Sequence, residues 1–232
     1  SLSVVAGRVL TVQNFQARGE SPFFSANDRS RWCTIRSVGD NGTYEIDDVI
    51  RGGQPIDWDS IDKVQHVGED GRLHFYSSKP TLLPTLLAGV YRGVKSITGK
   101  DLENDPIFVT RLMLLFVNVG GWAIYLFFMA LTINSIPVRD WARYYVLACA
   151  GFGTYLSTYV NTLNNHLPAA ISVMIALYCL SVIWRKQHAG WRYFFAAGLF
   201  SALAAANELP ALSFFSFAAL YCIVRSPRRM AT

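Results

Sequence analysis

The sequence predicts an α-helical polytopic membrane protein with a polar loop before its spans, and three observations support this. Only two of the 16 acidic residues, Asp140 and Glu208, follow Pro106, so the first part of the 232-residue chain suits water and the second suits lipid. Several apolar runs after Pro106 approach the roughly 20 residues that a helix needs to cross about 30 Å of hydrocarbon. Lys and Arg gather in alternate connectors between these runs, as the positive-inside rule describes.

The chain divides into three parts. Residues 1–12 are apolar but too short to span, and we expect the end of a truncated transmembrane helix, in a chain that is a piece of a longer protein. Residues 13–105 form a polar loop, and residues 106–232 a five-span transmembrane region. We expect the spans near residues 108–133, 141–160, 167–184, 191–206 and 209–225.

Within the loop, alternation of β-branched or aromatic residues with polar ones predicts short strands at residues 42–47 and 72–77. Residues 81–97 instead predict an amphipathic helix that lies in the membrane interface. Its apolar face comprises Leu82, Leu83, Leu86, Leu87, Val90, Tyr91 and Val94, while Arg92 and Lys95 lie off that face. The alternative is a helix that packs on a soluble core.

Cations in the connectors predict the orientation. One set of span ends carries Arg139, Arg143, Arg185, Lys186, Arg192, Arg225, Arg228 and Arg229. The opposite connectors, residues 161–166 and 207–210, carry no Lys or Arg. We therefore expect the first set to be cytoplasmic, and Asp28, Lys79, His166 and Glu208 to face the extracytoplasmic side.

Other site classes are excluded or left open. The net charge of +5 does not indicate nucleic-acid binding, because the cations form no stripe with interleaved aromatics. The four cysteines lack CxxC spacing, so neither a disulfide framework nor a zinc site is predicted. His166 can cap a helix or meet a substrate. Glu208, in an apolar setting, can line a water-filled cavity, pair with a cation or simply lie at the interface.

Three segments in order, "DRSRWCTIRSVGDNGTYEID", "GRLHFYSSKPTLLPTLLAGVYR" and "VTRLMLLF", resemble the first extracytoplasmic loop of GT-C membrane glycosyltransferases. The closest type is the protein mannosyltransferase and aminoarabinose–lipid A transferase group, glycosyltransferase family 39. The resemblance covers roughly residues 25–225. It implies a GT-C-like transmembrane bundle whose first loop carries short strands and an interfacial helix.

The resemblance also implies roles for individual residues. Asp28 matches the family's first acidic position and would be the catalytic base. Arg31 matches the Arg-aromatic pair, Tyr76 and Lys79 match the aromatic-Lys-Pro run, and Arg111 matches the later arginine. These four would bind the donor's lipid phosphate, and His166 and Glu208 would meet the acceptor or line its cavity.

Simpler roles compete with these. Asp28 also fits a helix N-cap, Lys79 a snorkelling lysine, and Arg111 an interfacial anchor. Arg29 replaces the family's second acidic residue, which weakens the case for a metal between two adjacent carboxylates. No cofactor is implied with certainty, and a divalent metal stays open.

The implied reaction is the inverting transfer of a sugar from a polyprenyl-phosphate donor to an unknown acceptor outside the cytoplasm, at a bacterial inner membrane. A carboxylate would take the acceptor's proton, and fixed cations would stabilise the leaving phosphate. Two alternatives are a transporter-like polytopic protein and a non-catalytic protein that keeps the fold.

Overall fold

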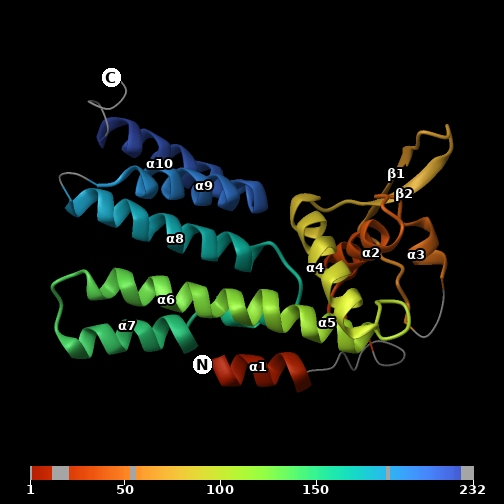
Figure 1. The fold of residues 1–232 in the computed structure, drawn as a ribbon, viewed down its shortest axis with the longest axis horizontal. Coiled ribbons are helices and arrows are strands. Elements are labelled where there is room, and N and C mark those ends of the chain that lie inside the picture. The colour runs from red at the N-terminus through yellow and green to blue at the C-terminus, as the bar shows by residue number, and fades with distance from the viewer. Residues whose placement is uncertain (1, 12–20, 53–55, 187–188, 226–232) are drawn as a thin grey trace. The chain divides into compact units, whose positions relative to one another are not determined.

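The computed structural model describes residues 2–11, 21–52, 56–186 and 189–225, and these form two compact units (Figure 1). The N-terminal unit comprises residues 3–119 and 160–164, and the helical unit comprises residues 1–2, 120–159 and 165–232. The division at Gly120 differs from the predicted one at Pro106, because the helix that begins at Pro106 first packs inside the N-terminal unit.

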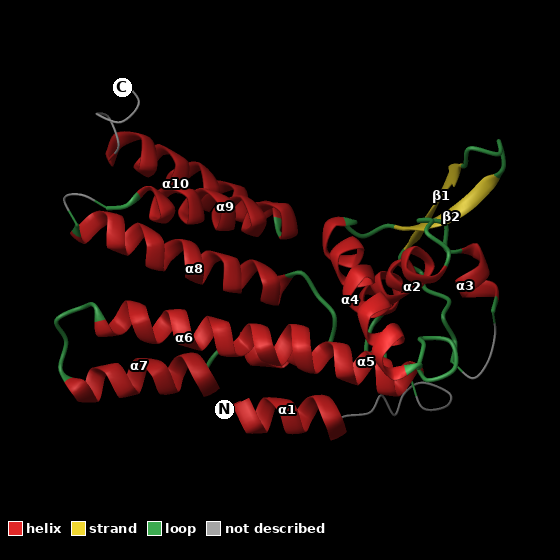
Figure 2. Cartoon of the chain, in the orientation of Figure 1, coloured by secondary structure: helices red, strands yellow, loops and turns green. Residues whose placement is uncertain are grey.

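The N-terminal unit combines helices with one β-hairpin (Figure 2). Its elements are α1 (Leu2–Thr11), α2 (Ala26–Asp40), α3 (Asp47–Arg51), β1 (Lys63–Val67), β2 (Leu73–Ser77), α4 (Leu82–Thr98), α5 (Pro106–Leu114) and the π-helical turn η1 (Leu115–Val119). Trp32, Ile35, Tyr91, Val109 and Met113 are among its buried core residues.

The contact between α2 and α4 organises this unit. The Tyr91 ring of α4 lies directly over Gly39 of α2, where a Cβ atom would come within 2.3 Å of the ring. The Tyr91 hydroxyl donates to the Asp40 carboxylate at 3.0 Å. Arg92 donates to the carbonyls of Gly39 and Val38, which are among the last of α2. The basic residues of α4 therefore stabilise the C-terminal end of α2, where cations are favourable.

The strand prediction is half confirmed. β2 occupies residues 73–77 of the predicted 72–77 and pairs antiparallel with β1, from Lys63 opposite Ser77 to Val67 opposite Leu73. The predicted strand at residues 42–47 is wrong. That segment is a turn that leads into α3, and it contributes one ladder-like bond, from Ile46 N to Phe75 O at 2.9 Å.

The predicted interfacial helix at residues 81–97 exists as α4, but its apolar face is divided. Leu83, Leu87, Tyr91 and Val94 are buried in the unit. Leu82, Leu86, Val90 and Ile97 remain exposed, Leu86 to 60%. Four of the seven residues of the predicted face thus match the alternative of a helix packed on a core, and the other three, Leu82, Leu86 and Val90, stay exposed.

The helical unit is built from α6 (Gly120–Asn134), α7 (Asp140–Phe152), the 3-10 turn η2 (Tyr155–Asn161, shared with the N-terminal unit), α8 (His166–Arg185), α9 (Trp191–Asn207), the 3-10 turn η3 (Leu209–Ala211) and α10 (Leu212–Arg225). The central helix α8 packs against α6, α9 and α10. Residues Ile175, Cys179 and Ile183 of α8 are buried with Ala197 of α9 and Ala218 of α10.

Two helices among the described residues are long and apolar enough to cross a membrane, Pro106–Asn134 and His166–Arg185. By length and composition alone, these two indicate membrane association. The other three predicted spans are shorter. The one at residues 141–160 is not a single helix, because α7 ends at Phe152 and a 3-10 turn follows Gly153. A helix of 14 residues such as α10 extends only about 21 Å.

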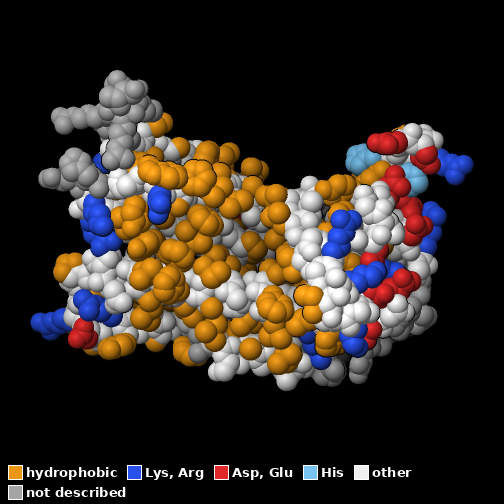
Figure 3. All heavy atoms as spheres, viewed as in Figure 1, with side chains coloured by type: hydrophobic (Ala, Val, Ile, Leu, Met, Phe, Trp, Pro, Cys, Tyr) orange, Lys and Arg blue, Asp and Glu red, His pale blue; other side chains and the backbone are white. Residues whose placement is uncertain are grey.

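Exposed apolar side chains cover the visible face of the helical unit (Figure 3). The large exposed apolar side chains of this unit include Trp141, Tyr144, Trp184, Trp191, Phe195, Phe217 and Leu220. A protein surface in water rarely exposes so large an apolar area, whereas a lipid-facing surface requires it. The cations predicted at one set of span ends include Arg228 and Arg229, which lie outside the described residues.

The approach of Tyr91 to Gly39 generates a prediction. Gly39→Ala should destabilise the protein by about 1–3 kcal/mol, because its methyl group overlaps the Tyr91 ring and the packed helices must move apart. Denaturant unfolding in detergent micelles measures the change. Gly93→Ala, on the same helix pair but facing open space, is the control and should be neutral or stabilising. Equal stability of the Gly39 variant and the wild type would refute the contact.

Candidate functional site

Asp28 is a buried carboxylate that accepts hydrogen bonds from three N–H groups. Its Oδ1 accepts from Trp32 Nε1 and from Leu163 N, both at 2.9 Å, and its Oδ2 accepts from Phe24 N at 3.1 Å. Only 2% of the residue is exposed. Its own amide donates to the Ser25 hydroxyl, so Ser25 and not Asp28 is the N-cap of α2. The carboxylate therefore connects α2 to a segment far along the chain.

Burial raises the pKa of Asp28 from 3.8 to about 6, and the N–H bonds and nearby Arg31 oppose that rise. The side chain is still mostly ionised at pH 7. Its surroundings are those of a structural carboxylate, because most of its lone pairs are already used and water is excluded. The catalytic role predicted for Asp28 stays a prediction, and it requires an acceptor to displace one of these donors.

The segment that Asp28 binds is held from a second side. Asn118, buried in the π-helical turn η1, donates its Nδ2 to Val160 O at 2.8 Å and to Thr162 O at 2.9 Å. π-helical turns inside α-helices often mark functional positions, and here the turn accompanies a side chain directed at residues 160–162. Residues 160–164 thus belong to the N-terminal unit although their neighbours in sequence do not.

The other predicted donor-binding residues are already engaged. Lys79 forms an ion pair with Asp62 at 3.1 Å. Arg31 is buried and donates to Asn27 O at 3.0 Å, among other contacts. The Asp62 carbonyl accepts from the Ser30 hydroxyl of α2 at 2.6 Å, so Lys79 is tied indirectly to the same helix as Asp28. The described contacts place Lys79 with Asp62 and do not pair it with Asp28.

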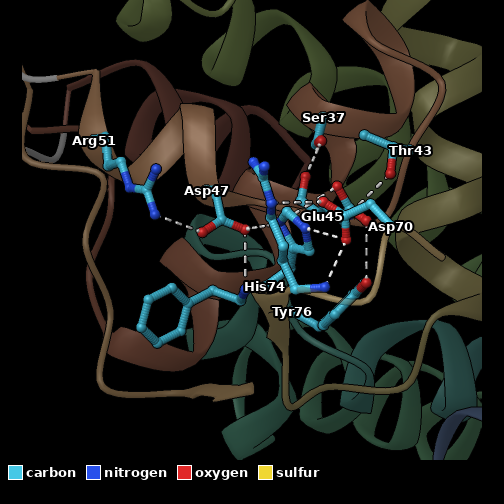
Figure 4. A network of polar contacts seen from close by, with 10 residues as sticks. Ser37, Thr43, Glu45, Asp47, Arg51, Asp70, His74 and Tyr76 are labelled. Atoms are coloured by element: carbon cyan, nitrogen blue, oxygen red, sulfur yellow. Dashed lines mark hydrogen bonds and ion pairs between the residues drawn. The ribbon is translucent and has the colours of Figure 1, made fainter. Parts of the chain in front are cut away.

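Tyr76 belongs to a different network, centred on His74 (Figure 4). The His74 ring lies between Asp47 at 3.2 Å and Asp70 at 3.0 Å, with Glu45 at 3.6 Å. Tyr76 donates to Glu45 at 3.2 Å. The hydrogen bond to Asp70 is the largest cause that raises the pKa of His74. This network joins the hairpin to the start of α3, and Tyr76 therefore has a structural partner instead of a free hydroxyl.

Acidic groups do not form a metal centre in the described part of the chain. The described residues contain no group of three or more His, Cys, Asp or Glu side chains arranged to hold a metal ion. Arg29, at the position where the resembled family has its second acid, binds Asp57 at 3.5 Å and the Asp59 carbonyl at 2.6 Å. Arg29 therefore holds the loop before β1 against α2.

Arg111 has a different environment from the other predicted residues, because it lines a cavity of about 620 Å³ beside α5. The walls are mainly apolar and comprise Leu10, Ile56, Asn104, Asp105, Pro106, Ile107, Phe108, Arg111, Leu112 and Leu115. Asp105 is neutralised by Lys100 at 2.5 Å. The ammonium of Lys100 also lies 4.7 Å from the centre of the Phe108 ring. No carboxylate within the described ranges pairs with Arg111.

His166 and Glu208 meet in the helical unit. His166 Nδ1 lies 2.8 Å from Glu208 Oε1, and the Tyr159 ring lies 4.6 Å from the His166 ring. Beside them, Asn165 Nδ2 donates to Asn207 O at 3.1 Å. The two connectors thus lie together at one end of the helices, and Glu208 has a histidine partner that sequence proximity does not reveal. The predicted extracytoplasmic position of both residues stays a prediction.

The cavity itself was not predicted, although one of its residues was. Sequence order gives Arg111 as the arginine that opens a span, but Leu10 and Ile56 come from distant segments and carry no signal of their own. No family model, curated protein or solved structure matches this chain.

The environment of Asp28 generates a prediction about pH. The pKa of Asp28 is higher in the folded state than the unfolded value of 3.8. The contribution of Asp28 to the free energy of unfolding is therefore fully present below about pH 4 and decreases as the pH rises toward about 6. Asp28→Asn should abolish this decrease in the free energy of unfolding with rising pH. It should also lower stability at pH 7 by about 1–3 kcal/mol, because an amide N–H₂ faces N–H donors.

Unfolding free energies from pH 4 to pH 7 measure both effects. The control is Asp57→Asn, on an exposed carboxylate, which should change stability by less than about 0.5 kcal/mol and leave the pH profile intact. The account of Asp28 fails if the Asp28 variant keeps the wild-type pH profile.

Proposed function

We propose that this chain is a membrane glycosyltransferase that takes a sugar from a polyprenyl-phosphate donor and transfers it, with inversion, to an extracytoplasmic acceptor. The observation that carries the proposal is the cavity beside α5, which combines apolar walls with Arg111, an arginine that pairs with no carboxylate among the described residues. A polyprenyl-phosphate sugar has matching chemistry, since an anionic phosphate joins a polar sugar to an apolar chain. The motif resemblance in the loop points to the same substrate class.

The size and position of the cavity suit the head of such a lipid. About 620 Å³ lies within the range of small-molecule sites, and it accommodates a sugar phosphate with the first part of a prenyl chain. α5 is the start of an apolar helix long enough to cross a membrane, so a lipid bound beside it would have its head near the bilayer surface.

Arg111 is the proposed electrostatic catalyst. The phosphate gains negative charge as the sugar leaves, and a guanidinium fixed nearby stabilises that charge more in the transition state than in the ground state. Arg111 can offer two parallel N–H donors to a phosphate. Arg31, Lys79 and Tyr76 would have to exchange present partners to assist.

The acceptor's base is less constrained. For Asp28 to take a proton, a hydroxyl must displace Leu163 N from Oδ1 or Phe24 N from Oδ2. The exposed pair of His166 and Glu208 contributes a second proton-accepting group for an acceptor.

The proposed location is a bacterial inner membrane with the loop outside the cytoplasm. The distribution of charge on α8 supports this orientation, because His166 and its partner Glu208 lie at one end and Arg185 lies at the other. Arg192 and Arg225 terminate the neighbouring helices at the cationic end.

A non-catalytic lipid-binding protein is the second candidate. Arg29 favours it, because this arginine occupies the position where the resembled enzymes have a carboxylate. Arg29 binds the Asp57 carboxylate and the Asp59 carbonyl instead. Such a protein would hold the donor without transferring the sugar. The transporter-like alternative has no specific contact in its favour.

The test measures binding and transfer separately. Protein reconstituted in nanodiscs is titrated with undecaprenyl phosphate, and transfer is followed with a radiolabelled polyprenyl-phosphate sugar. Arg111→Gln should weaken binding about 10-fold or more, because a charge-assisted hydrogen bond contributes about 1.5–3 kcal/mol. Arg72→Gln, on the exposed hairpin, is the matched control and should bind like the wild type.

Undecaprenol, which has the same chain with a hydroxyl in place of the phosphate, should bind equally to the wild type and to Arg111→Gln. Binding of the phosphate lipid without any transfer would select the non-catalytic candidate. Equal affinity of the wild type and Arg111→Gln for undecaprenyl phosphate would remove the basis of the proposal.

A further inference from the structure

A second apolar cavity, of about 440 Å³, lies within the helical unit between α8 and α10. Its lining comprises Leu177, Leu180, Ser181, Trp184, Phe217 and Tyr221. Three of these side chains form an aromatic stack. The Tyr221 ring lies 6.1 Å from Trp184 at 17° and 6.2 Å from Phe217 at 20°. The groove thus offers a flat, rigid wall along which a hydrocarbon chain can lie.

Two arginines border this groove, and both bind the same part of α8. Arg185 donates Nη2 to the Ser181 hydroxyl at 3.3 Å and Nε to the Ser181 carbonyl at 3.0 Å. Arg225 donates Nη2 to the Trp184 carbonyl at 2.7 Å, and its Cζ lies 5.9 Å from the centre of the Trp184 ring. Residues 181 and 184 are one turn apart on a helix, so the two guanidiniums approach one side of α8.

The described partners of both guanidiniums are neutral oxygens. Arg185 has Ser135 O as a third partner, at 3.0 Å, and every partner of the two arginines is a neutral oxygen. In the part of the chain that the structure describes, neither forms an ion pair with a carboxylate, and both are exposed. A guanidinium carries five N–H donors, so each arginine retains donors for an anion.

We infer that this groove binds one anionic phospholipid of the bilayer, with an acyl chain against Trp184, Phe217 and Tyr221 and the phosphate between Arg185 and Arg225. Apolar grooves between membrane helices that end in cations are suited to anionic headgroups. A zwitterionic lipid brings its own cation toward the two arginines, so it should bind more weakly. α8 is apolar and long enough to cross a membrane, which supports a membrane lipid as the occupant.

This site is separate from the proposed donor cavity. The groove contains residues of α8 and α10 only, whereas the donor cavity contains residues of the N-terminal unit. The lipid would act as a structural ligand that joins the last helix to the central one. The inference does not depend on the proposed function, and either can fail alone.

Native mass spectrometry of the detergent-solubilised full chain tests the inference with two probes, phosphatidylglycerol and phosphatidylcholine of the same acyl chains. The wild type should retain phosphatidylglycerol at least about 10-fold more than phosphatidylcholine. The double variant Arg185→Gln/Arg225→Gln should retain the two lipids about equally. Arg192→Gln, on an exposed arginine at the start of α9 that is not part of the groove, is the matched control and should keep the preference.

A third variant tests the groove without changing charge. Leu177 lines the groove and is 41% exposed, so Leu177→Trp can fill the space without disturbing the core. It should lower retention of phosphatidylglycerol about 10-fold, while circular dichroism reports an unchanged helix content. Equal retention of the two lipids by the wild type would overturn the inference. So would a loss in Arg192→Gln as large as in the double variant, or unchanged retention in Leu177→Trp.

Discussion

The N-terminal unit depends on one buried carboxylate. Asp28 binds the chain before α2, the Trp32 indole within α2, and the amide of Leu163, which lies 135 residues further along the sequence. An ionised group excluded from water is unfavourable unless hydrogen bonds replace its hydration, and these three N–H groups do so. Removing one partner leaves either a buried charge or a buried N–H without a partner. The fold around the candidate site therefore depends on the hydrogen bonds of Asp28.

This constraint also explains how the site is arranged. Asn118 holds the same segment from the π-helical turn, and that turn directly continues α5, which carries Arg111 and one wall of the cavity proposed to bind the donor. Asp28 and the helix that lines the cavity are thus connected through residues 160–164, although Asp28 does not line the cavity. Among the described residues Arg111 has no carboxylate partner, and the neighbouring acid, Asp105, pairs with Lys100. The proposed binding of an anionic lipid depends on this arginine beside apolar walls.

Local patterns predicted much of the fold, and long-range partners could not be predicted. The amphipathic pattern of residues 81–97 predicted the helix, but not that Leu83 and Leu87 are buried in the unit while Leu86 stays exposed. The alternating segment at residues 42–47 suited a strand, yet the hairpin turn after Val67 brings β1 to β2 instead. In the site, the sequence identified Asp28, Lys79 and Arg111 as candidate functional residues. Their partners Leu163 and Asp62, and the absence of one for Arg111 among the described residues, follow from tertiary packing.

Hydrogen exchange at the Leu163 amide tests the role of Asp28 most directly. This N–H donates to a carboxylate that is almost fully enclosed, so exchange in the wild type should be slow, comparable to that of the α2 core. Replacing Asp28 with Ala should make Leu163 exchange fast while the amides in the middle of α8 stay protected. Fast exchange at Leu163 in the wild type, or protection that survives the loss of the carboxylate, would contradict the account.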